Sequence, residues 1–135
     1  MQSLMKDLAI TLADRPGTLA KATEAIAKAG INIEGAAGVP CGGEGIFHVL
    51  TTDAAATRRA LEGAGFRVSG EQQVLVVDVP DKAGSAAQIF KRLAEASVNV
   101  TLFYVATGAR IVIGADNVQK ANDTLAKQPI ATART

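Results

Sequence analysis

The chain has 135 residues, of which 48% are hydrophobic and 20% are charged, and its formal net charge is +1. This composition is typical of a globular protein, and the balanced charge gives no electrostatic reason to expect nucleic acid or an anionic membrane as a partner. No segment approaches the roughly 20 apolar residues that span a bilayer, and the N-terminus lacks the apolar core of a signal peptide. Cys41, the only cysteine, has no second thiol for an intramolecular disulfide. We therefore expect a cytoplasmic protein.

The first half of the chain predicts the element order strand, helix, strand, strand, helix, strand. Leu8, Ile10 and Leu12 alternate with more polar residues, which indicates a strand with one buried face. After a turn, apolar residues recur at steps of three and four, which predicts a helix that Gly30 ends. Asp53 is expected to cap the second helix. The four strands are expected at residues 8–12, 31–39, 46–51 and 66–68, with a glycine-rich hairpin at residues 38–45.

A repeat organises the whole chain. An Asp, a Gly and an Asn recur in register 67 residues later, with apolar residues kept between them. The pairs are Asp14 and Asp81, Gly17 and Gly84, and Asn32 and Asn99. The second copy predicts strands at residues 74–79, 98–106, 110–114 and 130–132, with Asp116 as the cap of its last helix. We therefore expect two domains, residues 1–70 and 71–135, joined around residues 70–72.

The repeated order of elements is that of the ferredoxin-like βαββαβ unit, an α+β fold. Right-handed crossovers place both helices on one face of a four-stranded antiparallel sheet. A unit of this size buries little surface alone, and the chain holds only four Phe and one Tyr. We therefore expect the two units to pack as a tandem pair, and a homodimer would add further burial.

The run from Asp14 to Ala20, followed after one helix by Ala29 to Ile33, resembles the hallmark of the ACT domain. The pattern of that family is a strand, an Asp- or Asn-x-Pro-Gly turn with Leu nearby, a helix, and a strand that begins hydrophobic-Asn-hydrophobic. The second copy keeps the Asp, the Gly and the Asn but has Ala83 where proline is usual. The two copies cover essentially the whole chain, which is similar to stand-alone tandem ACT proteins that bind amino acids.

The resemblance implies that paired ACT sheets bind a free amino acid at their shared interface, and no cofactor or metal is expected. A helix N-terminus that begins with glycine favours the ligand carboxylate. A carboxylate in the turn can accept from the α-ammonium, and an Asn side chain offers both a donor and an acceptor. The candidate ligand-binding residues are Leu12, Asp14, Arg15, Pro16, Gly17, Thr18, Asn32 and Ile33 in the first copy, and Asp81, Gly84, Ser85 and Asn99 in the second.

Each candidate also has a purely structural explanation. Asp14 could cap the helix or stabilise the turn, and the glycines could be present only because the turn needs a permissive backbone. Strand interiors are depleted in Asn, so Asn32 and Asn99 between β-branched residues require an explanation. A structural hydrogen bond across the domain interface is the alternative to ligand contact.

Catalysis is poorly supported by the sequence. His48, the only histidine, is expected to be structural, Cys41 has no histidine nearby to activate it, and no cluster has metal-ligand spacing. Two hypotheses remain for a protein that is not an enzyme. It is a sensor of a small or apolar free amino acid, since no charged residue is placed to meet the ligand side chain. Alternatively, it is a regulatory subunit or oligomerisation module of a metabolic enzyme, with a vestigial ligand site.

Overall fold

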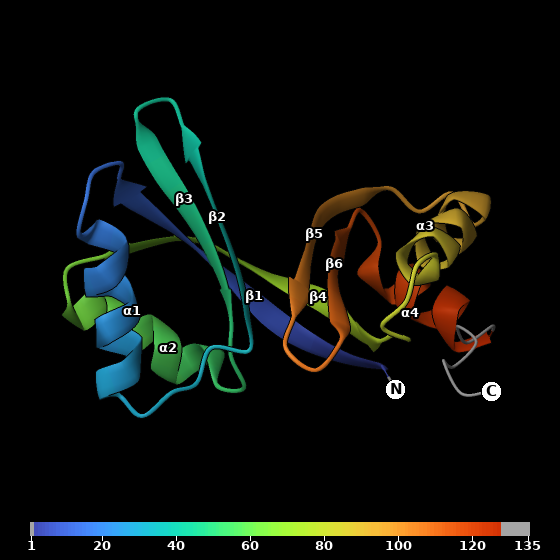
Figure 1. Ribbon diagram of the computed structural model, residues 1–135, viewed down its shortest axis with the longest axis horizontal. Coiled ribbons are helices and arrows are strands. Elements are labelled where there is room, and N and C mark those ends of the chain that lie inside the picture. Colours follow the sequence, from blue (N-terminus) through green and yellow to red (C-terminus); the bar gives the residue numbers. More distant parts are fainter. Residues whose placement is uncertain (1, 128–135) are drawn as a thin grey trace. The chain divides into compact units, whose positions relative to one another are not determined.

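The computed structural model describes residues 2–127, which fall into two compact units (Figure 1). The N-terminal unit consists of residues 6–72, and the C-terminal unit consists of residues 73–127 together with residues 2–5. The domains expected from the repeat, residues 1–70 and 71–135, differ from these units mainly at the N-terminus. Residues 2–5 begin the first strand of the chain but lie with the second copy of the repeat.

The N-terminal unit has the predicted order of elements. They are β1 (Gln2–Ala13), α1 (Thr18–Lys28), β2 (Gly35–Cys41), β3 (Glu44–Leu50), α2 (Ala54–Gly63) and β4 (Arg67–Asp78). β3 lies between β1 and β2 and is antiparallel to both. The Ser69 hydroxyl at the start of β4 donates to the Ala9 carbonyl of β1 over 3.1 Å, which places the two strands side by side.

One face of this sheet carries the core of the unit, because alternate residues of each strand point toward the helices. Leu8 lies opposite Val49, and Ile10 lies opposite Phe47, and all four side chains are buried. The complete cluster consists of Leu8, Ile10, Leu12, Ala22, Ile26, Phe47, Val49 and Leu61. The strand and helix stripes read from the sequence therefore meet in one core.

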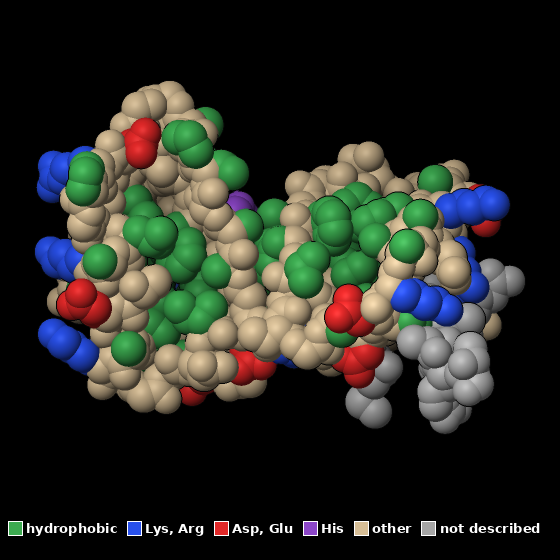
Figure 2. Space-filling view, in the orientation of Figure 1, with side chains coloured by type: hydrophobic (Ala, Val, Ile, Leu, Met, Phe, Trp, Pro, Cys, Tyr) green, Lys and Arg blue, Asp and Glu red, His purple; other side chains and the backbone are tan. Residues whose placement is uncertain are grey.

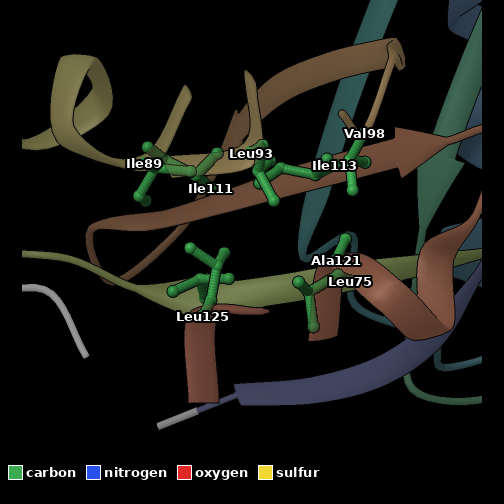
Figure 3. Close-up of a cluster of buried hydrophobic side chains, with 9 residues drawn as sticks. Leu75, Ile89, Leu93, Val98, Ile111, Ile113, Ala121 and Leu125 are labelled. Carbon is green, nitrogen blue, oxygen red and sulfur yellow. The ribbon is translucent and has the colours of Figure 1, made fainter. Parts of the chain in front are cut away.

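The C-terminal unit repeats this arrangement. Its further elements are α3 (Ser85–Glu95), β5 (Val100–Ala106), β6 (Arg110–Ala115) and α4 (Val118–Lys127). β6 lies between β4 and β5 and is antiparallel to both. Figure 3 shows side chains of α3, α4 and the strands meeting in its core, including Leu75, Ile89, Leu93, Ile113 and Leu125. The N-terminal unit thus has the α+β, ferredoxin-like order with antiparallel strands, and the described part of the C-terminal unit follows the same order as far as α4, while their packing as a tandem pair stays a prediction.

Residues 2–5 are part of the C-terminal unit by direct contact. The Gln2 side chain donates to the backbone carbonyl and to the Oδ1 atom of Asn122, at 3.0 and 2.7 Å. Leu4 packs against the core cluster of the unit. The last predicted strand, residues 130–132, lies outside the described residues.

The strands that follow α1 and α3 begin later than predicted. β2 begins at Gly35 and β5 at Val100, not at residues 31 and 98. The Glu34 N–H donates to the Leu50 carbonyl over 2.8 Å just before the first of these ladders. Asn32 and Asn99 therefore precede their strands, and the argument that an Asn inside a strand needs a special reason does not apply.

Two other boundaries differ from the prediction. The strands expected at residues 66–68 and 74–79 are one continuous strand, β4, so the join around residues 70–72 lies inside a strand. The hairpin expected at residues 38–45 turns at Gly42 and Gly43, with φ of 58° and 86°. Two positive φ angles in a two-residue turn match the twist of the flanking strands. Gly38 and Gly45 consequently lie in the strands and not in a loop.

One of the two predicted helix caps is confirmed and the other is wrong. The Asp53 carboxylate accepts a hydrogen bond from the Ala56 N–H at the start of α2 over 3.0 Å. α4 begins at Val118, and the side-chain oxygen of Asn117 accepts from the Lys120 N–H over 3.0 Å. Asp116 lies one residue too early to cap this helix, and its carboxylate accepts from the Asn99 N–H.

Candidate functional site

The turn between β1 and α1 carries most of the candidate residues of the first copy. Gly17 precedes α1 with φ of 93°, and no side chain caps the first turn of the helix. The Thr18 hydroxyl donates to the Ala13 carbonyl over 2.7 Å and to the Arg15 carbonyl over 3.0 Å, which fixes the shape of the turn. The first N–H groups of a helix have no intrahelical acceptor and favour an anion. The turn therefore presents uncapped donors.

A hollow of about 240 Å³ adjoins this turn, and we call it the helix-side groove. From the turn and α1 it is lined by Asp14, Arg15, Thr18 and Leu19. From the strands it is lined by Leu12, Gly38, Gly45 and Phe47, among others. Figure 2 shows hydrophobic side chains exposed in the hollow between α1 and the β2–β3 hairpin. The groove is thus apolar along its floor and charged at the end where the turn lies.

A second hollow, of about 420 Å³, adjoins the same turn. Its lining includes three basic side chains, Arg15, Lys21 and Arg67, and one acidic side chain, Glu44. The Lys21 ammonium also lies 5.8 Å from the centroid of the Phe66 ring, a distance at which a cation is attracted to the face of an aromatic ring. Arg15 lines both hollows, so its guanidinium contributes positive charge on both sides of the turn.

The structure brings together some of the predicted site residues but not all of them. Leu12, Asp14, Arg15 and Thr18 line the helix-side groove, and Pro16 and Gly17 form the turn beside it. Two others lie elsewhere: the Asn32 side chain is exposed and donates to the Glu34 carboxylate over 3.0 Å, and Ile33 packs against the core. Asp14 does not cap α1, because the residue at that position is Gly17.

The second copy forms the same turn with different contacts. Gly84 precedes α3 with φ of 93°, as Gly17 does in the first copy, and Asp81 is exposed in the turn. Ser85 is only 3% exposed, and its hydroxyl has no hydrogen-bond partner within residues 2–127. Asn99 is held through its backbone N–H, which donates to the Asp116 carboxylate over 3.1 Å.

The sequence did not identify the floor of the groove. The sequence predicts Gly38 and Gly45 in a glycine-rich hairpin and a strand at residues 46–51, and neither prediction marks a site. Gly38 lies opposite Phe47, and Gly45 lies opposite both Leu12 and Pro40. Placing the turn at the Gly-Gly pair and counting the register back along both strands would have found these positions.

His48 forms a partly buried pair on β3. Its Nδ1 atom lies 2.7 Å from the carboxylate of Asp7, which is 1% exposed. The hydrogen bond to Asp7 raises the pKa of His48, and partial burial opposes this rise. The pair lies away from the groove, since β1 residues alternate and Leu8, next to Asp7, points into the core. Its position supports the structural role expected for this histidine.

Within residues 2–127, no three His, Cys, Asp or Glu side chains gather closely enough to hold a metal ion. None of the helices there is long and apolar enough to cross a membrane.

Comparison with known proteins finds a family match within the first copy of the repeat. Residues 6–62 match the family model of the ACT domain, and no curated protein matches the chain. A solved protein of Bacteroides thetaiotaomicron is 24% identical with a TM-score of 0.85, and the match covers 96% of this chain and 91% of that one. The ligand-free regulatory subunit of aspartate kinase from Thermus thermophilus is 19% identical with a TM-score of 0.67, covering 93% and 95%. The corresponding subunit from Thermus flavus is 18% identical with a TM-score of 0.61, covering 94% of each chain. At these identities the likeness shows a shared fold.

Proposed function

Because residues 6–62 of this chain match the family model of the ACT domain, we propose that the protein binds a free amino acid at the β1–α1 turn of its N-terminal unit and acts as a regulatory sensor. The observation that carries this proposal is the groove itself. Four residues that the sequence marked as ligand contacts, Leu12, Asp14, Arg15 and Thr18, line one hollow beside an uncapped helix N-terminus.

The charges at the turn suit both ends of a zwitterion. The ligand carboxylate would accept from the first N–H groups of α1 and from the Arg15 guanidinium. The α-ammonium would donate to the Asp14 carboxylate, which is exposed in the turn. Asp81 and Lys82 give the second turn the same pair of charges. A partner that binds the ligand-occupied turn and the empty turn with different affinity would respond to the amino acid.

A regulatory role agrees with the shared fold. The solved subunits of aspartate kinase that have this fold are regulatory subunits. For this chain, the partner would be a protein whose binding to it changes when the amino acid is added. The alternative hypothesis is a regulatory or oligomerisation module whose ligand site is vestigial.

Thermal unfolding in the presence of each of the twenty amino acids separates these hypotheses. A ligand at a hundred times its dissociation constant stabilises the folded state by about 2.7 kcal/mol, which for a protein of this size moves the midpoint by several degrees. We expect at least one amino acid to raise the midpoint, and Asp14→Ala to abolish the rise. If none of the twenty has an effect at millimolar concentration, the vestigial-site hypothesis is correct.

A further inference from the structure

We propose that the helix-side groove receives an aliphatic ligand side chain, and that within residues 2–127 only the N-terminal unit offers such a groove, so that each chain binds one apolar amino acid. This inference rests on the proposed function and adds to it the class of ligand and the stoichiometry. It comes from comparing the same positions in the two units.

The groove exists because two strand positions lack side chains. Gly38 lies opposite the buried Phe47, and Gly45 lies opposite Leu12, so both face the helices. Neither glycine is required by its backbone, since neither has the positive φ of Gly42 and Gly43. A Cβ atom built on Gly38 would come no closer than 3.8 Å to any neighbouring atom. The absence of a side chain at Gly38 leaves room in the groove, and the backbone conformation does not require a glycine there.

The C-terminal unit carries larger side chains at the corresponding positions, and they are partly exposed, Phe103 by 46% and Val105 by 64%. The repeat aligns Ala36 and Gly38 with Phe103 and Val105, which also lie opposite core residues of the neighbouring strand. The Phe103 ring contacts Phe90 of α3 edge to face, with 4.7 Å between the centroids. Figure 2 shows hydrophobic side chains gathered over β5 and beside α3.

The helix residue that lines the groove also differs between the units. Leu19 of α1 lines the groove and is 49% exposed, whereas the repeat places Ala86 at this position of α3. The turns themselves are alike, since Asp14 and Arg15 correspond to Asp81 and Lys82. The two units therefore share the end that suits a zwitterion, and they differ at the end that would hold its side chain.

The dimensions and chemistry of the groove indicate its occupant. Its volume of about 240 Å³ is smaller than the roughly 300–1,000 Å³ of pockets for drug-sized ligands. Asp14 and Arg15 provide one negative and one positive charge at one end, and Leu12, Leu19 and Phe47 provide an apolar remainder. A small zwitterion with an uncharged aliphatic side chain complements both ends. A charged side chain would lose its hydration among these apolar groups without gaining a partner.

Isothermal titration calorimetry on the full chain tests the inference with leucine, norleucine, valine, alanine, glutamate and lysine. We expect the larger aliphatic amino acids to bind at least tenfold more tightly than alanine, glutamate or lysine, with one ligand per chain. Gly38→Val, which gives the first unit the residue of the second, should weaken leucine binding at least tenfold, and Gly38→Ala should have a smaller effect. Ala36→Val is the matched control, because Ala36 is exposed on the same face of β2 but does not line the groove.

The possible outcomes are distinct. If the unaltered protein binds no amino acid, the proposed function fails and the inference fails with it. If it binds amino acids without preferring aliphatic ones, binds two per chain, or keeps its affinity for leucine in Gly38→Val, the inference alone is overturned. Valine suits a strand, so Gly38→Val should keep the thermal midpoint. If that variant does not fold, Gly38→Ala and the ligand series on the unaltered protein still decide.

Discussion

Gly17 and Gly84 show how the repeat is fixed at the level of a single residue. Both precede a helix with φ of 93°, a conformation that other residues adopt only at a cost. No atom lies within 4 Å of a Cβ built on either glycine, so the cost of a side chain would come from the backbone alone. The same residue is therefore needed in both units, whether or not a ligand binds there.

We predict that Gly17→Ala and Gly84→Ala each lower the free energy of unfolding by about 1–3 kcal/mol, the usual cost of holding a side chain in a strained backbone conformation. Urea denaturation of the full chain measures this. Gly63→Ala is the control, because Gly63 ends α2 without a positive φ and also has open space around it. That variant should be as stable as the unaltered protein or slightly more stable. A Gly17→Ala variant of unchanged stability would contradict the prediction.

The pair of His48 and Asp7 makes stability depend on pH. The pKa of His48 is raised in the folded protein, chiefly by its hydrogen bond to Asp7. The folded state therefore holds the proton more tightly than the unfolded state, whose pKa is about 6.5. The resulting stabilisation is fully present below the unfolded pKa, and it is lost as the pH rises through the higher folded pKa.

We expect His48→Gln to reduce the free energy of unfolding by about 1.5–3 kcal/mol at about pH 5.5, as for other hydrogen bonds to charged groups. The difference from the unaltered protein should shrink as the pH rises toward about 8.5. Denaturant unfolding across this range provides the measurement. His48 is the only histidine, so no other imidazole contributes to the difference. A difference that grows with rising pH would show that the pair does not act in this way.

Among the elements, α2 differs from α1 in how its N-terminus is satisfied. The Asp53 carboxylate caps α2 by accepting from the Ala56 N–H, and α2 has no acidic residue in its first turn to replace it. α1 begins at a glycine without any side-chain cap. α3 begins in the same way as α1, at Gly84 and without a side-chain cap. The first N–H groups of these two helices are therefore left to other acceptors, whereas one of those of α2 has a side-chain partner.

Asp53→Ala should therefore lower the free energy of unfolding by about 0.5–2 kcal/mol, the usual cost of losing an N-cap. Asp53→Asn keeps an oxygen that can accept from the same N–H, so it should cost much less. Thermal unfolding of the two variants side by side gives the comparison. Equal losses in both would mean that the charge of Asp53 matters and its hydrogen bond does not.

The sequence predicted the elements better than it predicted their edges and the site. Periodicity identified the helices and strands that lie within residues 2–127, because the buried faces repeat at regular steps. The floor of the groove was missed because Gly38 and Gly45 read as a loop until the turn is placed at the next two glycines. Asn32 was misplaced for a related reason, since a β-branched pattern does not show where a ladder begins.

For the whole molecule, the feature that the sequence could not show is the place of residues 2–5. They continue β1 without a break, yet they pack in the C-terminal unit through Gln2 and Leu4. Such membership depends on a contact between Gln2 and Asn122, which are 120 residues apart in sequence, and on a core whose first residue is Leu75. β4 likewise runs through Gly70 without a break. Its residues 67–72 belong to the N-terminal unit, and its residues 73–78 belong to the C-terminal unit.

These two strands predict that the halves of the chain do not fold well apart. A fragment of residues 71–135 lacks Gln2 and Leu4, which contact α4 and the core of its unit. The other fragment, residues 1–70, loses Glu71, whose carboxylate pairs with Lys6 at 3.2 Å and with Arg58 at 3.1 Å. Small units bury too little surface to tolerate such losses. We expect each fragment to show weak, non-cooperative thermal unfolding by circular dichroism.

Leu4→Ala in the full chain is the milder form of the same test. It removes an apolar side chain that is half-buried against the core of the C-terminal unit. Truncating a fully buried leucine costs about 2–5 kcal/mol, and partial exposure should bring the cost below that range. Hydrogen exchange should localise the loss to α3, α4 and β6, with less effect on α1 and α2. Two fragments that each unfold cooperatively at the midpoint of the full chain, together with a Leu4→Ala variant of unchanged stability, would show that residues 2–5 do not support the C-terminal unit.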